Sequence, residues 1–326
     1  MKNNIVVVGC GYWGSIIINS IKKLKKFKQI YICDKDTIKT KIIKKRFNNF
    51  VKIININEIS KNTDIKFVYL ATPPSKNLKL VRYILPLNKN IMLEKPGFSK
   101  INEFKIIKKE LKKSKSKLRF GYIYLYHDYI KYLKKIIMTK KFGKIKYIKF
   151  QRQNFGPIRN DVNSFADLAT HDLSIIKFLF NKKPKLKKYI KHDILRSKSG
   201  DVISANFMIN KIPIDINVSW LNPEKVRKIT IITDKQMILF DEMNIDRPIQ
   251  IFDNYAHYPK LSKFTKSYFS KKAFVYKGKS SYIKINDSKP LDNEINDFIN
   301  EKKNISDIDF SSDIIKLANK VILRPS

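Results

Sequence analysis

The segment at residues 166–172, ADLATHD, holds side chains that could carry out acid–base chemistry. His171 is one of only four histidines, and imidazole, with an ordinary pKa of about 6.5, exchanges protons at neutral pH. Asp167 precedes it by four residues, so on an α-helix the two side chains share one face. Asp172 points about a hundred degrees away and is expected to serve the first helical turn or an interdomain contact. The segment therefore holds a candidate general base that shares a helix face with a carboxylate, although a lone histidine on an apolar helix is more often structural.

A second group of residues, VVVGCGYWG near the N-terminus, has the pattern of a dinucleotide site. Gly9, Gly11 and Gly14 form GxGxxG directly after an apolar run, in a chain with only 9 glycines. The first glycine permits a tight turn, the second lets the backbone approach a pyrophosphate, and the third lets helix and strand pack closely. The free amides at the helix start, with Tyr12 and Trp13, would receive the phosphate charge.

The residue that should select the dinucleotide is Asp34, which ends the second apolar run. A carboxylate at this position accepts hydrogen bonds from the ribose hydroxyls and repels a 2′-phosphate. The sequence therefore predicts NAD rather than NADP, although the neighbouring Lys35 weakens the discrimination.

Two further segments, ATPP at 71–74 and EKPG at 94–97, follow apolar runs. Open α/β sheets bind their ligands at the carboxyl ends of strands. Thr72 and Pro73 would form a wall against the nicotinamide ribose. Lys95, fixed between Glu94 and Pro96, would point into the crevice. Its ammonium group could stabilise a developing alkoxide or lower the pKa of a nearby base.

These residues need a scaffold, and the first 120 residues alternate β-rich apolar runs with amphipathic stretches. The runs lie at 5–8, 30–33, 67–71, 91–94 and 117–122. Helices are expected at 13–26, between the second run and about residue 47, at 75–85 and at 101–113. Continuous apolar strands between helices indicate a parallel sheet covered on both faces, so the fold class is α/β with an N-terminal Rossmann domain.

The second half has a different pattern. A long helix at 165–180 is followed by alternating strands at 203–209, 214–220, 228–233 and 237–241, which predicts an open, mostly antiparallel sheet. The stretch 253–280 is expected to be a long loop. The boundary should fall between 121 and 143, which gives a Rossmann domain at 1–121 and a substrate and oligomerisation domain at 122–326.

The composition limits the classes of partner. The formal net charge of +40 suggests nucleic acid, but only nine of the 68 basic residues are arginine and the lysines are dispersed. Cys10 and Cys33 fall in segments expected to be buried, which indicates a reducing compartment rather than a disulfide framework. Since no apolar run reaches the length of a membrane span, a cytoplasmic protein is expected.

The fingerprint, ATPP, EKPG and the DxxxHD segment, in this order and spacing, resemble the glucose–fructose oxidoreductase/inositol dehydrogenase (Gfo/Idh/MocA) family. The resemblance covers nearly the whole chain and implies a Rossmann domain followed by an α/β domain. It also implies that Lys95 and His171 flank the reacting carbinol and that Asp167 contacts the substrate. The stretch from 154 to 180, with VSWLNPEKVRKITI, resembles a branch associated with nucleotide sugars and surface polysaccharides.

Other candidate site residues rest on their position. Arg159 and Asn163 precede the candidate catalytic helix and could bind a substrate carboxylate or phosphate. Tyr124 lies in a segment that borders the substrate mouth in relatives, although family members often have Asn or Arg there, and strand-face packing is an equal alternative. Trp220 is expected to pack the second sheet. His127 and the remaining histidines show no ligand spacing, so no metal site is expected.

The leading hypothesis is an NAD-dependent oxidoreductase that acts on a ring hydroxyl or ketone of a sugar, in particular a nucleotide sugar. A free polyol or inositol dehydrogenase is the alternative within the same chemistry. A basic nucleic-acid-binding protein on a Rossmann scaffold and a catalytically silent dinucleotide sensor are alternatives of other classes. The resemblance further implies a homodimer or homotetramer, with no nucleic-acid or membrane partner.

Overall fold

The computed structural model describes residues 3–160, 162–197, 199–258, 273–285 and 288–322. The chain divides into two compact units, Met1–His127 with Ser288–Lys316 and Asp128–Asp287 with Leu317–Ser326. This division differs from the expected one, because a C-terminal segment belongs to the first unit. The first break, after His127, falls inside the expected interval.

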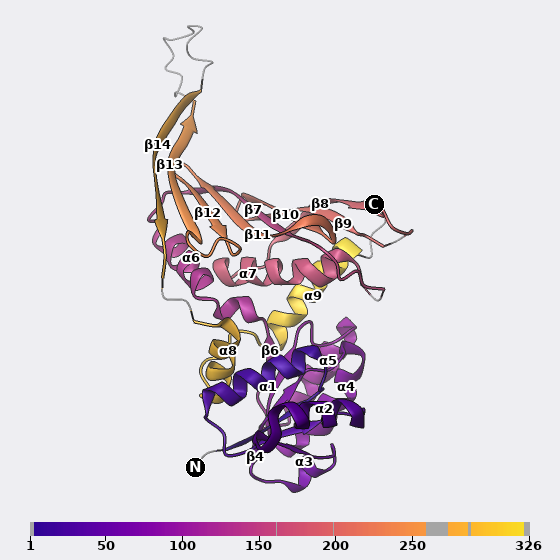
Figure 1. Cartoon of the computed structure of the whole chain (residues 1–326). Helices are drawn as coiled ribbons and strands as arrows, with labels where there is room; N and C mark the ends of the chain where they lie inside the picture. Colours follow the sequence, from indigo (N-terminus) through magenta and orange to yellow (C-terminus); the bar gives the residue numbers. More distant parts are fainter. Residues whose placement is uncertain (1–2, 161, 198, 259–272, 286–287, 323–326) are drawn as a thin grey trace. The chain divides into compact units, whose positions relative to one another are not determined.

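The first unit, whose N-terminal part is drawn in indigo and purple in Figure 1, is built on a six-stranded parallel sheet with the order β3-β2-β1-β4-β5-β6. Its strands are β1 (Asn4–Val8), β2 (Ile30–Cys33), β3 (Val51–Ile53), β4 (Ile65–Leu70), β5 (Asn90–Glu94) and β6 (Leu118–Gly121). The expected Rossmann architecture is confirmed. The sequence analysis assigned no residues to β3, a three-residue edge strand with one buried side chain.

Helices cover both faces of this sheet. Its helices are α1 (Tyr12–Leu24), α2 (Thr37–Phe47), α3 (Glu58–Lys61), α4 (Pro74–Ile84), α5 (Ile101–Leu111), α8 (Pro290–Ile299) and the first part of α9 (Ile308–Ile322). One core joins α1, α2 and α8 to the sheet, with Phe298 of α8 packed edge-on against Phe67 of β4 at 5.3 Å between ring centroids. The helix α8 therefore completes a layer that begins at the other end of the chain.

The second unit contains an eight-stranded sheet with the order β14-β13-β12-β11-β7-β10-β9-β8. Its strands are β7 (Ile145–Phe155), β8 (Lys185–His192), β9 (Val202–Ile209), β10 (Ile212–Ser219), β11 (Leu221–Thr233), β12 (Met237–Asp241), β13 (Ile249–His257) and β14 (Phe274–Ile283). Among the pairs in this sheet, β7 with β10 is parallel and the others are antiparallel. The expected mostly antiparallel sheet is confirmed.

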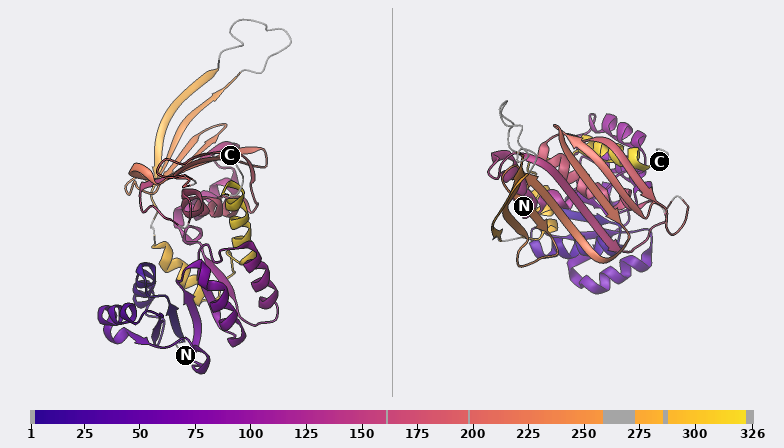
Figure 2. Two further views of the ribbon diagram at one scale, coloured as in Figure 1. Left: turned by 90° about the vertical axis from the view of Figure 1, so that its right-hand side faces the viewer. Right: turned by 90° about the horizontal axis from the view of Figure 1, so that it is seen from above.

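The helices α6 (Asp128–Thr139) and α7 (Thr170–Phe180) lie together on one side of this sheet (Figure 2). Strands such as β9 alternate between buried and half-exposed residues, so the buried side chains face these helices. The helix expected at 165–180 is present, but its first turn, Phe165–Ala169, is π-helical and continues directly into α7. Asp167 therefore lies in a widened turn, which is often found at functional sites.

The prediction of a long loop at 253–280 is wrong for the described part of that stretch. Residues up to His257 continue β13, and residues from Phe274 belong to β14, which pairs with it. The side chains of β14 are exposed over nearly its whole length, so the alternation that marks a half-buried strand is missing from the sequence. Residues 259–272 of the expected loop lie outside the described residues.

Candidate active site

The glycine-rich turn between β1 and α1 has the geometry of a phosphate-binding loop. A Cβ atom on Gly14 would lie 1.9 Å from the Gly9 carbonyl oxygen, so only glycine permits this close packing of helix and turn. A Cβ atom on Gly11 would meet nothing within 4 Å. Gly11 also stands at the N-cap of α1, whose first turn has no acidic residue and no side-chain cap. The helix start can therefore accept an anion.

Asp34 is placed beside this turn. Its carboxylate accepts hydrogen bonds from the backbone amides of Cys10 at 2.7 Å and of Asp36 at 3.0 Å. The side chain of Asp34 at the end of β2 is thus fixed next to the glycine turn. Burial, followed by the Asp34 charge, raises the pKa of the Cys10 thiol to about 12. Cys10 and Cys33 are free thiols that are buried, as expected.

The ATPP and EKPG segments are tied together by a residue that the sequence analysis did not single out. The Thr72 hydroxyl donates to the Asn77 side-chain oxygen at 2.5 Å, and the Asn77 amide donates to the Gly97 carbonyl at 2.6 Å. Asn77 is fully buried at the start of α4. This bridge fixes the loops after β4 and β5 relative to each other. Pro73 is the N-cap of α4, so the rigid wall expected here has a structural basis.

Glu94 ends β5, and Lys95 follows it as a half-buried residue. The Tyr69 hydroxyl donates to Glu94 Oε1 at 2.7 Å. Burial raises the pKa of the Glu94 carboxyl, while the Tyr69 hydrogen bond and the Lys95 charge act against that shift. The backbone N–H of Gly97 donates a hydrogen bond to the Glu94 carbonyl, and this bond closes the turn. The EKPG turn therefore presents a cation next to a carboxylate with one fixed oxygen.

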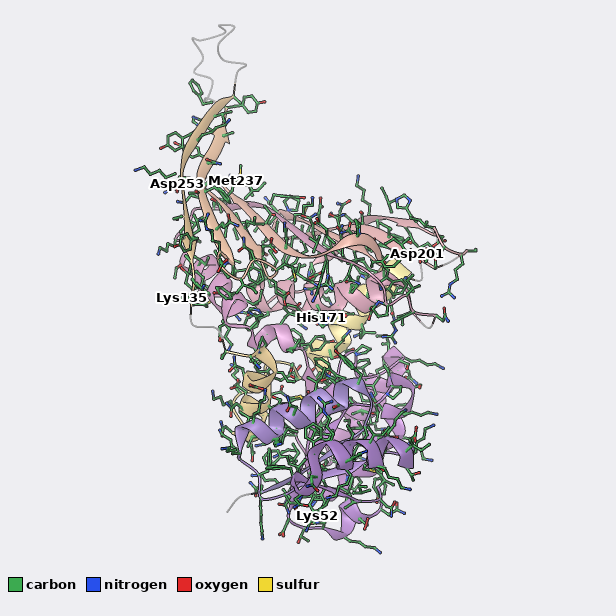
Figure 3. The ribbon with its side chains drawn as sticks, in the orientation of Figure 1. Lys52, Lys135, His171, Asp201, Met237 and Asp253 are labelled. Carbon is green, nitrogen blue, oxygen red and sulfur yellow. The ribbon has the colours of Figure 1, made fainter. Side chains whose placement is uncertain are left out.

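The candidate acid–base residues of the segment 166–172 lie around the start of α7, in the second unit, and Figure 3 labels His171 among them. Asp167 is held from two sides: the Trp220 indole N–H donates to Oδ2 at 3.3 Å, and Arg159 Nη1 lies 3.5 Å from Oδ1. Trp220 is fully buried, as expected for a packing residue, but it also donates this hydrogen bond. His171 follows in the first turn of α7 and is half-buried. The Asp167 carboxylate is thus held in a fixed orientation four residues before His171.

Of the two roles expected for Asp172, the interdomain contact is wrong, because its charged partner lies within the same unit, whereas Asp172 does lie in the first turn of α7. Arg152 of β7 contacts Asp172 Oδ1 through Nε at 2.9 Å and Nη2 at 2.8 Å, and both side chains are buried. Burial raises the pKa of Asp172 more strongly than Arg152 lowers it. This pair anchors the first turn of α7, and with it His171, to the centre of the sheet.

Arg159 and Asn163 are placed on the loop before the π-helical turn. Asn163 Oδ1 accepts from the Ala166 amide at 2.8 Å, so this side chain caps the turn. Arg196 donates to the Arg159 carbonyl at 3.1 Å and fixes the backbone that carries the exposed Arg159 side chain. Substrate contacts by Arg159 and Asn163 remain predictions.

Tyr124 lies in the first unit, in a 3₁₀ turn at Ile123–Tyr126 rather than in a strand. Its ring stacks on His127, with 6.2 Å between centroids and 7° between planes. The strand-face packing that the sequence allowed is therefore wrong, and a substrate contact remains a prediction.

Two observations concern other kinds of site. Within the described part of the chain, every helix is too short or too polar to cross a lipid bilayer. Among the same residues, no three His, Cys, Asp or Glu side chains gather in a way that could hold a metal ion.

The parallel sheet, the glycine turn and the helix start define a dinucleotide-binding oxidoreductase, and comparison with known proteins gives its family. The family described as "Oxidoreductase family, NAD-binding Rossmann fold" matches residues 3–122. Residues 3–122 therefore match the NAD-binding part of this family, Gfo/Idh/MocA, and the resemblance stated from the sequence is confirmed for that part of the chain. No curated protein sequence matches the chain.

Solved structures show the same fold over the whole chain. UDP-N-acetylglucosamine 3-dehydrogenase GnnA from Acidithiobacillus ferrooxidans has a TM-score of 0.78 at 16% identity, covering 99% of this chain and 97% of that one. GenD2 from gentamicin A biosynthesis, in complex with NAD, gives 0.74 at 13%, covering 98% and 92%. Aldose-aldose oxidoreductase from Caulobacter crescentus gives 0.76 at 12%, covering 98% and 96%. At these identities the likeness concerns the fold alone.

Proposed function

We propose that this protein transfers a hydride between NAD and a ring hydroxyl or ketone of a sugar, with a nucleotide sugar as the substrate. The observation that carries the proposal is the Asp167 carboxylate, fixed by Trp220 and Arg159 four residues before the half-buried His171. Bound NAD supplies the hydride acceptor. The residues of this chain must then bind the sugar, orient the carbinol and remove its hydroxyl proton.

The candidate residues of each unit have their own part in this work. The start of α1 binds the pyrophosphate, and Asp34 binds the adenosine ribose and favours NAD over NADP. His171 takes the hydroxyl proton, and Lys95 stabilises the oxygen as it gains negative charge. Asp167 anchors a neighbouring hydroxyl of the sugar, and Arg159 offers a guanidinium to a phosphate. Asn163, Tyr124, Tyr12, Trp13 and Pro96 are proposed as additional contacts.

The roles of Lys95 and His171 can be separated from cofactor binding. We expect Lys95→Ala and His171→Ala each to lower kcat by roughly 10²- to 10⁴-fold, because each removes a proton-transfer or charge-stabilising group. NADH binding, followed by nicotinamide fluorescence, should persist in both variants. Loss of NADH binding in both folded variants would contradict the assigned roles.

The substrate class is tested by the absorbance of reduced nicotinamide. Purified protein and NAD are mixed with a panel of UDP-sugars, the matching free sugars and inositols. A signal with UDP-sugars alone supports the nucleotide-sugar proposal. The panel includes UDP-N-acetylglucosamine, because the structurally similar GnnA is named as a dehydrogenase of that compound. A signal with free polyols alone would keep the site residues in their roles and replace the substrate. Salt-dependent DNA retention without NADH binding would favour the nucleic-acid alternative.

The proposal includes a cytoplasmic homodimer or homotetramer. Two free, buried cysteines support a reducing compartment. Sedimentation of the purified protein would give the subunit number directly.

A further inference from the structure

A carboxyl group lies in the apolar core of the first unit and has no place in the roles assigned above. Glu294, in the middle of α8, is 1% exposed. Its helix neighbours Leu291, Ile295 and Phe298 belong to the core that joins α8 to α1 and the sheet. An ionised carboxylate in such surroundings carries a large desolvation cost unless it is paired.

The partner of Glu294 is a tyrosine that already binds a second carboxylate. Tyr69 is fully buried on β4, and its hydroxyl oxygen lies 2.7 Å from Glu94 Oε1 and 3.3 Å from Glu294 Oε2. The other oxygen of Glu294, Oε1, is buried and has no hydrogen-bond partner among the described residues. One hydroxyl thus connects two acidic side chains that come from distant parts of the chain.

The number of protons shared by Glu294, Tyr69 and Glu94, which form a chain of hydrogen bonds, follows from counting donors and acceptors. A tyrosine hydroxyl has one proton to donate, and an ionised carboxylate has none. If both carboxyls were ionised, the hydroxyl could bond only one of them, and the other would remain buried, charged and unsatisfied. If Glu294 carries a proton, it donates to the tyrosine oxygen, which in turn donates to Glu94. Both hydroxyl protons then have an acceptor, and the unpartnered Oε1 of Glu294 is a neutral carbonyl oxygen rather than part of a buried charge.

The charges around Glu294 favour the protonated form. From β5 it faces Glu94, whose negative charge adds to burial in raising the pKa of Glu294 well above its ordinary value. In the turn after β6, burial and then the charge of Glu294 raise the pKa of the Tyr126 hydroxyl. On its own helix, Asp292 accepts from Ser20 of α1.

The buried cation of this region has other partners. Arg119 of β6 donates to the backbone carbonyls of Asp297 and Lys302. Burial raises the pKa of Glu94 as well, but hydrogen bonding to Trp13 and Tyr69 and the charge of Lys95 act against that shift, so more groups favour the charged form of Glu94 than that of Glu294.

We propose that Glu294 is a neutral carboxylic acid at physiological pH and positions Glu94 for the dinucleotide by donating a hydrogen bond through Tyr69. Glu94 is half-buried at the carboxyl end of β5. The hydrogen bonds from Glu294 through Tyr69 to Glu94 therefore connect the core with the edge of the sheet where the cofactor is proposed to bind. Glu294 is a positioning residue, because it acts through Tyr69. The effect on cofactor binding rests on the proposed dinucleotide site, whereas the proton on Glu294 does not.

The proton is tested without any ligand. The infrared spectrum of the full-length protein at neutral pH should contain the carbonyl band of a protonated carboxyl group, and Glu294→Gln should remove it. Asp297→Asn on the same helix is the matched control, because Asp297 pairs with the ammonium group of Lys302 at 3.0 Å. This control should leave the band unchanged. Absence of the band from the unmodified protein would overturn the proposal.

The pH dependence of stability gives a second test. Above the pKa of an exposed glutamate the unfolded chain releases this proton while the folded chain keeps it, so the unfolded state binds fewer protons. Stability should therefore fall as the pH rises from about 4.5 towards the raised pKa, by about tenfold in the folding constant per pH unit. Glu294→Gln should remove this component, and an unchanged profile in the variant would contradict the proposal.

The positioning role is tested by NADH fluorescence titration across the same pH range. Glu294→Gln keeps a donor to Tyr69 and should bind NADH as tightly as the unmodified protein at neutral pH, with no loss at higher pH. Glu294→Leu and Tyr69→Phe break the chain and should weaken binding about five- to tenfold. Unchanged affinity in both folded variants would overturn the role of Glu294. If the unmodified protein fails to bind NADH, the proposed dinucleotide site fails, while the infrared band still decides the proton.

Discussion

Gly11 and Gly14 belong to the same motif, but the space around them differs, and this difference separates folding from cofactor binding. A methyl group at Gly14 would collide with the Gly9 carbonyl, whereas one at Gly11 would enter open space. We expect Gly14→Ala to lower both stability and NADH affinity. Gly11→Ala should fold normally and still lose NADH affinity by more than about tenfold, because the methyl group occupies the place of the pyrophosphate.

The measurement is a paired thermal unfolding and NADH titration of the two variants. Equal loss of stability in both would contradict the open space at Gly11. Retained affinity in a folded Gly11→Ala protein would place the pyrophosphate elsewhere.

Residues in contiguous motifs could be predicted from the sequence, whereas their supporting contacts could not. Asp34 and Lys95 lie at strand ends, where the chemistry follows from the fold class. Trp220 binds Asp167 across 53 positions of sequence, and Glu294 binds Tyr69 across 225. A single sequence carries no signal of such pairing. A glutamate in an amphipathic helix resembles a solvent-exposed residue until the packing partner of the helix is known.

At the scale of elements, the buried pair between Arg152 and Asp172 fastens α7 to β7. Asp172→Asn removes a charged partner of the buried Arg152 guanidinium, and breaking a buried pair typically costs about 3 to 5 kcal/mol. The expected result is a lower free energy of unfolding in urea and reduced turnover, because α7 also carries His171. The matched control is Asp309→Asn, which removes an exposed partner of Lys108 and should cost about 1 kcal/mol or less. Similar losses in both variants would show that the Arg152 pair contributes no more than a surface contact.

The sequence predicted the strands whose side chains are either all buried or regularly alternate between buried and half-exposed. The core strands β1, β4 and β5 are continuous apolar runs, and β9 and β10 alternate regularly. The strands β8 and β14 lie at the two edges of the second sheet and expose most of their side chains. Their residues are lysine-rich or polar, so pairing with a neighbouring strand, rather than burial, determines their structure. That pairing is invisible in a local pattern.

At the scale of the whole molecule, the chain returns to its first unit near the C-terminus, and this explains why a single boundary near residue 121 was expected. A change of pattern along the sequence marks where the chain leaves a unit, but it gives no sign that a later helix comes back. The helix α8 is amphipathic and could cover either sheet. Its place is decided by Leu291, Ile295 and Phe298, which complete the core beside α1.

This return predicts that residues 1–127 do not fold stably alone. Burial of three large apolar side chains contributes about 1.5 to 3 kcal/mol each, and their sum is comparable with the 5 to 15 kcal/mol that stabilise a typical domain. A chain of residues 1–127 should lack a cooperative thermal transition. The same residues joined through a glycine–serine linker to 288–316 should unfold cooperatively and bind NADH, and Phe298→Ala in the joined protein should lower its midpoint. A cooperative transition of residues 1–127 at the midpoint of the joined protein would show that the C-terminal segment adds nothing to the Rossmann unit, and would also remove the structural basis for Glu294 as a part of it.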